Sequence, residues 1–389
     1  MPPGGLGVED QVSHGIGTLV CVTSSSSSYR DAGVDTAAGD LAVELMRQSV
    51  AATHGPRVLG GVGGFAGMFD VSFLKDFQRP LLAASTDGVG TKVAIAQAID
   101  KHDTIGQDLV GMVVDDIVVV GAAPLLMTDY IACGKVVPSR IAEIVGGIAR
   151  ACAETGTALV GGETAEHPGL LGPDDYDVAG AAVGAVEADA LLGPERVQAG
   201  DVVLALESSG LHSNGYSLVR HILAQRGIGY REHSAELGGM VGEVLLEPTR
   251  LYSAPLLRLI ESLGGGVHAL SHVTGGGIAA NLARVLPRGS TAEVERASWS
   301  PPAVFRVLSD WAGTTLGQAE GTWNLGIGMI AIVAPDAAEL AIAQLGTEGI
   351  RAWPLAEIRH GEPSGEGWEQ GAKGVDGGAV RLTGAYPAG

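Results

Sequence analysis

The sequence predicts an α/β (α+β) protein with two domains. Short runs typical of β-strands alternate with helical patterns along most of the 389-residue chain, as in mixed sheets covered by helices. A polar stretch at 187–200 that contains Pro194 interrupts this alternation, so we expect the domain boundary there. A composition of 46% hydrophobic and only 17% charged residues can form cores and argues against disorder.

The first expected domain covers residues 29–187 and follows an extension, residues 1–28, that we expect to be disordered because it contains a run of serines and little periodicity. Its expected strands are 81–85, 127–132, 157–160 and 176–186. One helix is expected over 108–120. Another is expected to begin at Ser139 as N-cap, since the apolar residues that follow recur at helical spacing through Cys152.

The second expected domain covers residues 188–360. Strands are expected at 201–206, 267–272 and 327–333, and helices near 213–226, 249–263 and 277–286. Residues 361–389 are rich in glycine, so we expect a loose segment apart from a short terminal element.

Charge and cysteine content exclude several classes of protein. The 24 basic and 44 acidic residues give a formal charge of −20, the wrong sign for binding nucleic acid through broad electrostatics. Cys21, Cys133 and Cys152 form no CxxC pair, which argues against a zinc knuckle or a disulfide framework. The longest apolar stretch, 109–127, carries two acids, which argues against a membrane span. We therefore expect a cytoplasmic protein without nucleic-acid or membrane partners.

Asp116 is the most informative single residue. On a helix over 108–120 its neighbours three and four positions away are all Met or Val, so it is expected on the apolar face. A carboxylate is costly there unless a cation or a hydrogen-bond donor compensates it, and it either holds a metal ion or makes a buried cap or ion pair. Asp115 points elsewhere and is expected to be partly solvated.

Two further segments favour a phosphate and metal site. In TDGVGTK at 86–92, Asp87 at a strand end can bind Mg²⁺, the glycines allow close backbone approach, and Lys92 adds a positive charge. An ordinary turn is the alternative. GGETAE at 161–166 closes a strand with two acids, where α/β sites collect ligands.

The segment GGVGGFAG at 60–67 formally satisfies the dinucleotide pattern GxGxxA. No convincing βαβ unit surrounds it, so we favour a loop that covers phosphates, with a plain turn as the alternative.

Two segments of the second half, SSGLHSNG at 208–215 and HVTGGG at 272–277, precede expected helices, whose free N–H groups suit a phosphate or carboxylate. Alternatively, Ser213 and Thr274 are N-caps, and His212 and His272 are satisfied core residues.

Taken in order, these segments resemble the phosphoribosylformylglycinamidine cyclo-ligase (AIR synthetase) family, from about residue 29 to residue 357. The motifs that carry the resemblance are YRDAGVD at 29–35, GGVGGFAG at 60–67, TDGVGTK at 86–92, HDTIGQDLVGM at 102–112, GGETAEHPG at 161–169, DYDVAG at 175–180, SSGLHSNGYSLVR at 208–220 and HVTGGG at 272–277. Arg30, Asp115, Ala123 and His167 stand where the family would lead us to expect Lys, Asn, Glu and Met.

The resemblance implies an ATP-dependent ring closure in purine biosynthesis. Formylglycinamidine ribonucleotide and ATP give aminoimidazole ribonucleotide, ADP and phosphate, through phosphorylation of the formamide oxygen and attack by the amidine nitrogen. It further implies Mg²⁺, and a homodimer whose N-terminal sheets pair into a shared barrel. Residues 29–187 would be the ATP-binding and dimerising domain, and 188–360 the C-terminal α/β domain.

The resemblance also assigns roles to individual residues. The implied catalytic residues are Asp116, His212, His272 and Lys92, and the implied metal ligands are Asp87, Asp116 and Glu163. The implied ATP-binding residues are Gly60, Gly61, Gly63, Gly64, Asp87, Gly88, Gly90, Thr91 and Lys92. The implied substrate-binding residues are Ser209, His212, Ser213, Asn214, Thr274, Gly275 and Gly276.

Three other functions remain open at this point. A related ATP-using enzyme, such as a selenophosphate synthetase or a thiamine-monophosphate kinase, is disfavoured by HSNGYSLVR, by GGETAE and by the lack of a reactive cysteine near the glycine loop. An NAD-binding oxidoreductase would have to be built on GVGGFA. A non-catalytic scaffold would have no need for Asp116 or for the intact DGVGTK.

Overall fold

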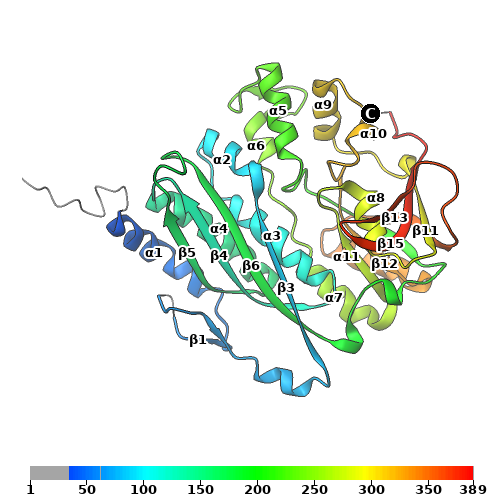
Figure 1. The fold of residues 1–389 in the computed structure, drawn as a ribbon, viewed down its shortest axis with the longest axis horizontal. Coiled ribbons are helices and arrows are strands. Elements are labelled where there is room, and N and C mark those ends of the chain that lie inside the picture. Colours follow the sequence, from blue (N-terminus) through cyan, green and yellow to red (C-terminus); the bar gives the residue numbers. More distant parts are fainter. Residues whose placement is uncertain (1–34, 62, 389) are drawn as a thin grey trace, which may run out of the picture.

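The computed structural model describes residues 35–61 and 63–388 of the chain. The expectations for residues 1–28 and for most of YRDAGVD therefore lie outside the described residues, as does Val62 of the glycine loop. Two layered units follow one another along the described chain, one on each side of the view in Figure 1.

The first unit is a four-stranded sheet covered by helices on one face (Figure 1). Its strand order is β3 (Pro80–Gly88), β6 (Tyr176–Glu187), β4 (Ala123–Cys133), β5 (Ala158–Glu166), with only β4 and β5 parallel. Helices α3 (Ile105–Val118) and α4 (Pro138–Thr155) pack on the sheet, and α1 (Thr36–Ala51) packs on α4. Helix α2 (Val93–Ile99) and the short hairpin of β1 (Val58–Leu59) and β2 (Met68–Phe69) complete the unit.

The alternation of side chains along the strands explains why only one face is covered. Met127 and Ile131 are buried beneath the helices, whereas Tyr130 between them is 41% exposed and Leu82 on β3 is 65% exposed. Large apolar side chains thus lie on a sheet face that no element of the described chain covers.

The second unit is a seven-stranded sheet with helices on both faces. Its order is β10 (Val267–His272), β12 (Ile327–Val333), β7 (Val202–Glu207), β13 (Ala352–His360), β11 (Ser290–Glu295), β15 (Val375–Thr383), β14 (Glu369–Ala372), parallel only between β11 and β15. Along β7, Leu204 and Leu206 face the core of α7 (Ser253–Leu263) and α11 (Ala338–Thr347). Val203 and Ala205 face the core of α8 (Gly277–Arg284).

Further helices join the two units. They are α5 (Tyr216–Arg226), α6 (Val241–Leu245), α9 (Ala303–Ala312) and α10 (Leu316–Ala319), with the short strands β8 (His233–Ser234) and β9 (Gly239–Met240) nearby. Tyr216 and Phe305 belong to the same hydrophobic core as Ile95 of the first unit. Apolar packing therefore continues across the junction.

Several expected elements are longer than their sequence patterns. The strand expected at 81–85 runs to Gly88, and the one expected to stop at Gly161 runs to Glu166. Backbone pairing with the neighbouring strands carries each of them through its glycines. Ser139 is not an N-cap, because α4 begins at Pro138, whose fixed φ suits the first helical position.

The prediction of a loose segment after residue 360 is wrong. Strands β14 and β15 complete the seven-stranded sheet. A Cβ at Gly377 would collide with the Ala283 carbonyl of α8, so this glycine permits close packing of strand on helix.

Among the described residues, no helix is both long and apolar enough to span a bilayer.

Candidate functional site

The two units meet at a cluster of ionisable side chains. Asp87 lies near the end of β3, Asp116 in the last turns of α3 and His272 at the end of β10. His272 Nδ1 and Asp116 Oδ1 are 2.9 Å apart and share a hydrogen bond. The structure thus brings together one implied catalytic residue of the second unit and two of the three implied metal ligands of the first.

The prediction for the two adjacent acids of α3 is inverted in the structure. The Asp116 side chain is 45% exposed, whereas Asp115 is fully buried. Asp115 accepts hydrogen bonds from the Tyr252 backbone N–H (3.2 Å) and from the Ser253 hydroxyl of the second unit. The helical pattern failed because α3 is covered by its own sheet on one side and by α7 on another, so burial extends around most of the helix.

Electrostatics couple the members of the cluster. Burial raises the pKa of Asp87, and the neighbouring charge of Asp116 raises it further. Burial is the largest influence on the pKa of Asp116 and acts to raise it, but the hydrogen bond from His272 and the positive charges of His272, Arg284 and Lys373 together outweigh it, so this pKa is lowered. Burial acts to lower the pKa of His272, yet the bond to Asp116 and the surrounding carboxylates raise it overall. An anionic Asp116 beside a readily protonated His272 is the favoured state.

Asp87 and Asp116 fit a magnesium ion that is shared with a phosphate ligand. Both are carboxylates, one oxygen of each is held by a protein donor (Gly88 N–H at 2.7 Å from Asp87 Oδ1), and Asp116 is open to solvent. Within residues 35–61 and 63–388 no three His, Cys, Asp or Glu side chains form a metal cage. Mg²⁺ commonly takes one or two carboxylates and completes its shell with phosphates and water.

Lys92 does not reach the site. Its side chain is fully buried, and its ammonium group donates to Asp108 Oδ1 (2.8 Å) and to the carbonyls of His212 (3.0 Å) and Glu247 (2.7 Å). These three bonds use all three ammonium hydrogens. Burial lowers the pKa of Lys92, and the Asp108 charge opposes that shift. The structure therefore does not place Lys92 where it would contact a phosphate, and its bonds instead join the two units internally.

His212 is likewise a core residue. It is fully buried, and its Nε2 accepts from the Ser209 N–H (3.3 Å). Burial lowers its pKa well below the usual value, so the ring is neutral near pH 7. The structure does not support the implied role in proton transfer. Ser213 is bound to Thr249, with 3.2 Å between the two hydroxyl oxygens.

The start of α8 forms a donor-rich turn beside the cluster. Gly276 is its N-cap with φ +105°, so Thr274 is not the cap, and Gly215 rather than Ser213 precedes α5. Asn214 Oδ1 accepts from the Gly275 N–H at 3.0 Å and so orders this turn. The implied substrate-binding residues Asn214, Thr274, Gly275 and Gly276 are thus brought together next to His272.

The remaining members of TDGVGTK continue from Asp87 into a short 3-10 turn, η2 (Gly90–Lys92). Gly90 has φ +69°, which a residue with a side chain rarely adopts. Thr91 Oγ1 lies 3.1 Å from Ser217 Oγ of α5, so Gly88, Gly90 and Thr91 follow Asp87 along the junction of the units.

Glu163 and the glycine loop lie away from Asp87 within one chain. Glu163 of β5 lies opposite Tyr130 of β4 in the strand register, so its side chain is on the same open face of the sheet. Asp87 and the buried Asp129 both lie opposite Gly180 of β6, so their side chains are on the covered face. The loop with Gly60, Gly61, Gly63 and Gly64 returns at Gly67, where a Cβ would collide with Val160 of β5. The edges β3 and β5 are three strand spacings apart, about 14 Å.

The elements on either side of the glycine loop are not those of a dinucleotide-binding motif. The loop joins β1 to the antiparallel β2, each two residues long, instead of joining a strand to a helix. The pattern GxGxxA is therefore coincidental, and the oxidoreductase hypothesis loses its basis.

Sequence reasoning missed three features of the site region. Asp108 balances Lys92 and also accepts from the Thr249 hydroxyl (2.7 Å). Tyr252 and Ser253 hold Asp115, and Lys373 of the C-terminal hairpin lies 3.5 Å from Thr274 Oγ1. The occurrence of Asp108 and Asp115 in an otherwise apolar stretch was available as a signal in the sequence. The position of Lys373 was not, because only the pairing of β14 with β15 brings it there.

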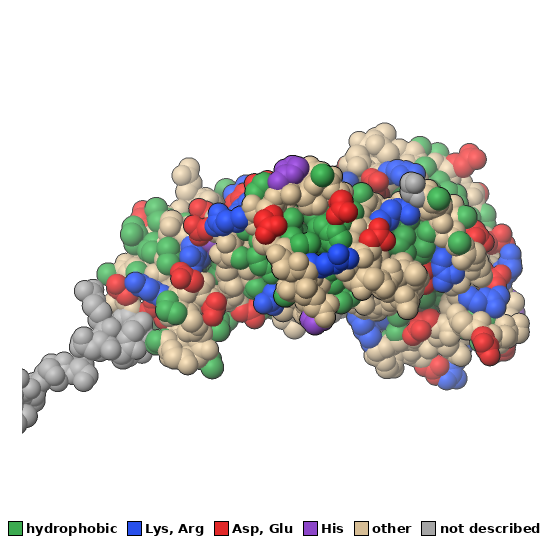
Figure 2. All heavy atoms as spheres, turned by 90° about the horizontal axis from the view of Figure 1, so that it is seen from above, with side chains coloured by type: hydrophobic (Ala, Val, Ile, Leu, Met, Phe, Trp, Pro, Cys, Tyr) green, Lys and Arg blue, Asp and Glu red, His purple; other side chains and the backbone are tan. Residues whose placement is uncertain are grey.

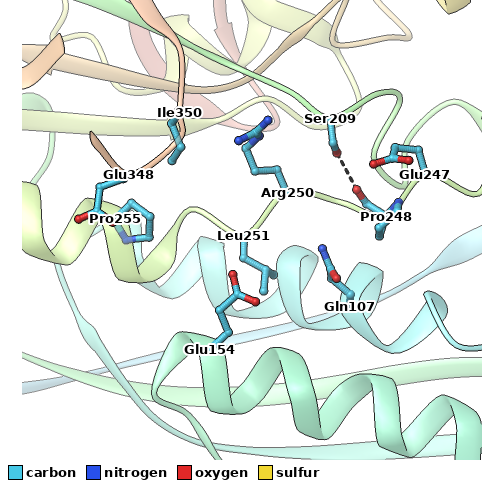
Figure 3. A pocket seen from close by; sticks show the side chains of 10 residues that line it. All are labelled: Gln107, Glu154, Ser209, Glu247, Pro248, Arg250, Leu251, Pro255, Glu348 and Ile350. Atoms are coloured by element: carbon cyan, nitrogen blue, oxygen red, sulfur yellow. Dashed lines mark hydrogen bonds between the residues drawn. The ribbon is translucent and has the colours of Figure 1, made fainter. Parts of the chain in front are cut away.

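A separate cavity of about 260 Å³ lies between the units (Figure 3). Gln107 and Glu154 line it from the first unit, and Arg250, Leu251 and Pro255 from the second. Ser209, an implied substrate-binding residue, faces this cavity and donates to the Pro248 carbonyl (2.6 Å) instead of joining the acid cluster.

The face drawn in Figure 2 carries acidic and basic side chains interspersed with apolar ones. On that face no continuous basic band is visible, in agreement with the net charge of −20.

Comparison with known proteins gives a consistent result. Residues 73–186 match the family model described as AIR synthase related protein, N-terminal domain, and residues 198–367 match the model of its C-terminal domain. The chain is 46% identical over 331 residues to the phosphoribosylformylglycinamidine cyclo-ligase of Desulfitobacterium hafniense, covering 85% of this chain and 96% of that one. It is 44% identical over 335 residues to the protein of the same name from Synechocystis, covering 86% and 97%.

Solved structures share the fold at lower sequence identity. A thiamine-monophosphate kinase from Stenotrophomonas maltophilia aligns with a TM-score of 0.59 at 17% identity, covering 88% of this chain and 95% of that one. The hydrogenase maturation protein HypE in complex with ATP aligns with a TM-score of 0.57 at 20% identity, covering 83% and 87%. These likenesses establish the two-unit mixed α/β architecture.

Proposed function

Because this chain belongs to the phosphoribosylformylglycinamidine cyclo-ligase family, and so is an ATP-dependent enzyme of purine biosynthesis, we propose that its reaction takes place at the Asp87–Asp116–His272 cluster. One observation carries the proposal. Two carboxylates of the first unit meet the donor-rich turn 274–276 of the second, with His272 hydrogen-bonded to Asp116. Oxygen ligands for a metal and N–H donors for an anion thus lie side by side.

The chemistry proceeds in two steps. The formamide oxygen of formylglycinamidine ribonucleotide attacks the γ-phosphorus of ATP, and the bond from that phosphorus to the ADP oxygen breaks. The amidine nitrogen then attacks the activated formyl carbon, phosphate departs and a proton is lost as the five-membered ring closes. Both steps depend on positioning of reactants and on stabilisation of charge.

The residues of the chain have distinct roles in this proposal. Asp87 and Asp116 would hold Mg²⁺, which neutralises the charge of the ATP phosphates. His272 is a positioning residue, since it holds Asp116 at Oδ1. Asn214 accepts from the Gly275 N–H and so orders the turn, and Thr274 and Gly276 on either side of Gly275 bind an anionic group of a substrate. Gly88, Gly90 and Thr91 line the approach from β3.

We further propose that the enzyme is a cytoplasmic homodimer. The open face of the first unit, with Leu82 and Tyr130, would pair with the same face of a second chain into a barrel. Within one chain the glycine loop and Glu163 are separated from Asp87 by the width of the sheet. A second chain across the barrel could bring them to it. Residues 29–187 are then the ATP-binding and dimerising domain, and 188–360 the C-terminal domain.

Release of phosphate from ATP tests the reaction. The purified enzyme with Mg²⁺ should release phosphate only when formylglycinamidine ribonucleotide is present, and aminoimidazole ribonucleotide should accumulate in equal amount. A folded protein that releases no phosphate under these conditions would contradict the proposal. Conversion of thiamine monophosphate to thiamine diphosphate, with ADP formed and no phosphate released, would assign it to the kinase instead.

Mixed dimers test the shared site. Asp87→Asn and Gly63→Val should each inactivate the enzyme alone. When the two variants are unfolded, mixed and refolded together, about a quarter of the wild-type activity should return, because half of the dimers are mixed and each of those has one intact site. No recovery, with dimers present by light scattering, would place the glycine loop and Asp87 in the same chain's site.

A further inference from the structure

The hairpin of β14 and β15 reaches the active-site cluster from a part of the chain that lies beyond the family match. The C-terminal family model ends at residue 367, whereas the hairpin spans 369–383. Strand β15 is held in the sheet by β11, and Arg288 pairs with Asp376 next to the hairpin turn. The turn is therefore a fixed part of the second unit.

Lys373 occupies an unusual backbone position at the tip of this hairpin. Ala372 pairs with Val375, so Lys373 and Gly374 form a two-residue loop, with φ values of 51° and 81°. A two-residue loop with both residues left-handed is typical of a type I′ turn, which prefers Asn, Asp or Gly at its first position. A lysine does not stabilise such a turn, because its side chain cannot hydrogen-bond to the turn backbone as that of Asn or Asp can. A strained position of this kind suggests a role for the side chain itself.

The side chain of Lys373 extends to the cluster. Its ammonium nitrogen lies 3.5 Å from Thr274 Oγ1, at the turn before α8. Burial raises the pKa of Asp87 and acts to raise that of Asp116, and the positive charge of Lys373 opposes both effects. The charge of Lys373 thus acts on both carboxylates from beside the turn 274–276, while that of Arg284 also acts on Asp116. Lys92 makes three hydrogen bonds inside the core and does not reach the cluster. Lys373, in contrast, is placed to contact an anion bound there.

We propose that Lys373 is a binding residue for a phosphoryl group of a substrate, completing the anion site made by Thr274 and the start of α8. Two sources offer this chemistry: the monoester phosphate of the ribonucleotide and the terminal phosphate of ATP. Lysine suits either one as a compact positive charge with three donors. The inference rests on the proposed function and adds to it a residue outside the family match.

Substitutions at position 373 separate charge from turn geometry. Lys373→Asn removes the charge and favours the left-handed conformation, so the hairpin should keep its fold. It should raise KM about tenfold for one substrate and leave kcat within about twofold. Measuring KM for each substrate with the other saturating identifies the phosphate bound. Lys373→Arg keeps the charge and should stay within about threefold of wild type.

A matched control is Lys75→Asn, which removes an exposed lysine of the first unit and should change neither KM. The inference is overturned if Lys373→Asn leaves both KM values unchanged, or if Lys373→Arg is impaired as much as Lys373→Asn with an equal loss in melting temperature. Failure of the proposed function is distinct, because the wild-type enzyme itself would then show no substrate-dependent release of phosphate.

Discussion

Asp116 of the first unit and His272 of the second are joined by a 2.9 Å hydrogen bond between Oδ1 and Nδ1. The orientation of the carboxylate proposed to meet Mg²⁺ is therefore set by a residue 156 positions away in the chain. The bond also makes the geometry of the site depend on how the two units pack.

Asp116→Asn should lower kcat/KM at least 100-fold without unfolding the protein, because it removes a preorganised charge at the reacting phosphates. It should also lower the pKa of His272, since burial then acts without the opposing carboxylate bond. Steady-state kinetics and an NMR titration of the histidine ring measure the two effects. Glu339→Gln, an exposed acid on α11, serves as control. An unchanged His272 pKa in the variant would contradict the coupling.

Lys92→Met should destabilise the fold by about 3–5 kcal/mol, since Asp108 would be left buried without its partner charge. Denaturant unfolding measures this loss. The same substitution made in an Asp108→Asn background should cost less, because no buried charge is abandoned. If Lys92→Met instead left stability intact and raised KM for ATP, Lys92 would be a phosphate ligand after all.

Removal of Mg²⁺ with EDTA should abolish activity and leave the fold unchanged, since the protein's own hydrogen bonds hold Asp87 and Asp116. Circular dichroism and activity assays follow the two properties. Asp87→Glu keeps a carboxylate but displaces it, so it should raise the Mg²⁺ concentration for half-maximal activity about tenfold, whereas Asp336→Glu at an exposed position on the second unit should not. Full activity in EDTA would exclude the metal from the mechanism.

The buried Asp129 should make stability depend on pH. Burial raises its pKa to about 7 in the folded protein, against an ordinary value of 3.8. A carboxyl group with a raised folded pKa stabilises the fold fully below pH 3.8, and this contribution is lost as pH rises to about 7. Asp129→Asn does not ionise, so its stability relative to wild type should increase from pH 4 to pH 7 and then level off. Denaturant unfolding across this range measures the difference. A relative stability that is the same at every pH would show that Asp129 does not titrate as proposed.

Much of the fold could be predicted because strands and helices leave local patterns. The strands expected at 267–272 and 327–333 match β10 and β12, which are largely buried in the second sheet. Ends were less predictable: β5 continues through Gly161 and Gly162 because β4 pairs with it. The glycine-rich C-terminus was misjudged because a glycine in a loop and a glycine required by close packing, such as Gly377, are identical in sequence.

The candidate site was predictable in kind more than in detail. Asp87, Asp116, His272, Asn214 and the turn 274–276 are brought together, whereas Lys92 and His212 are internal. The dinucleotide pattern at 61–66 failed because a motif has meaning only between a strand and a helix.

The sequence by itself determined the type and order of the elements, the family resemblance and the choice of acids that could bind a metal, since these depend on local periodicity and residue identity. The tertiary structure alone decided which of Asp115 and Asp116 is exposed, that Lys92 is spent on Asp108, and that Lys373 stands beside Thr274. The physical reason is that burial and charge pairing arise from contacts between different elements, 16 residues apart for Lys92 and Asp108 and 137 apart for Asp115 and Tyr252. No pattern along a single helix or strand records such contacts.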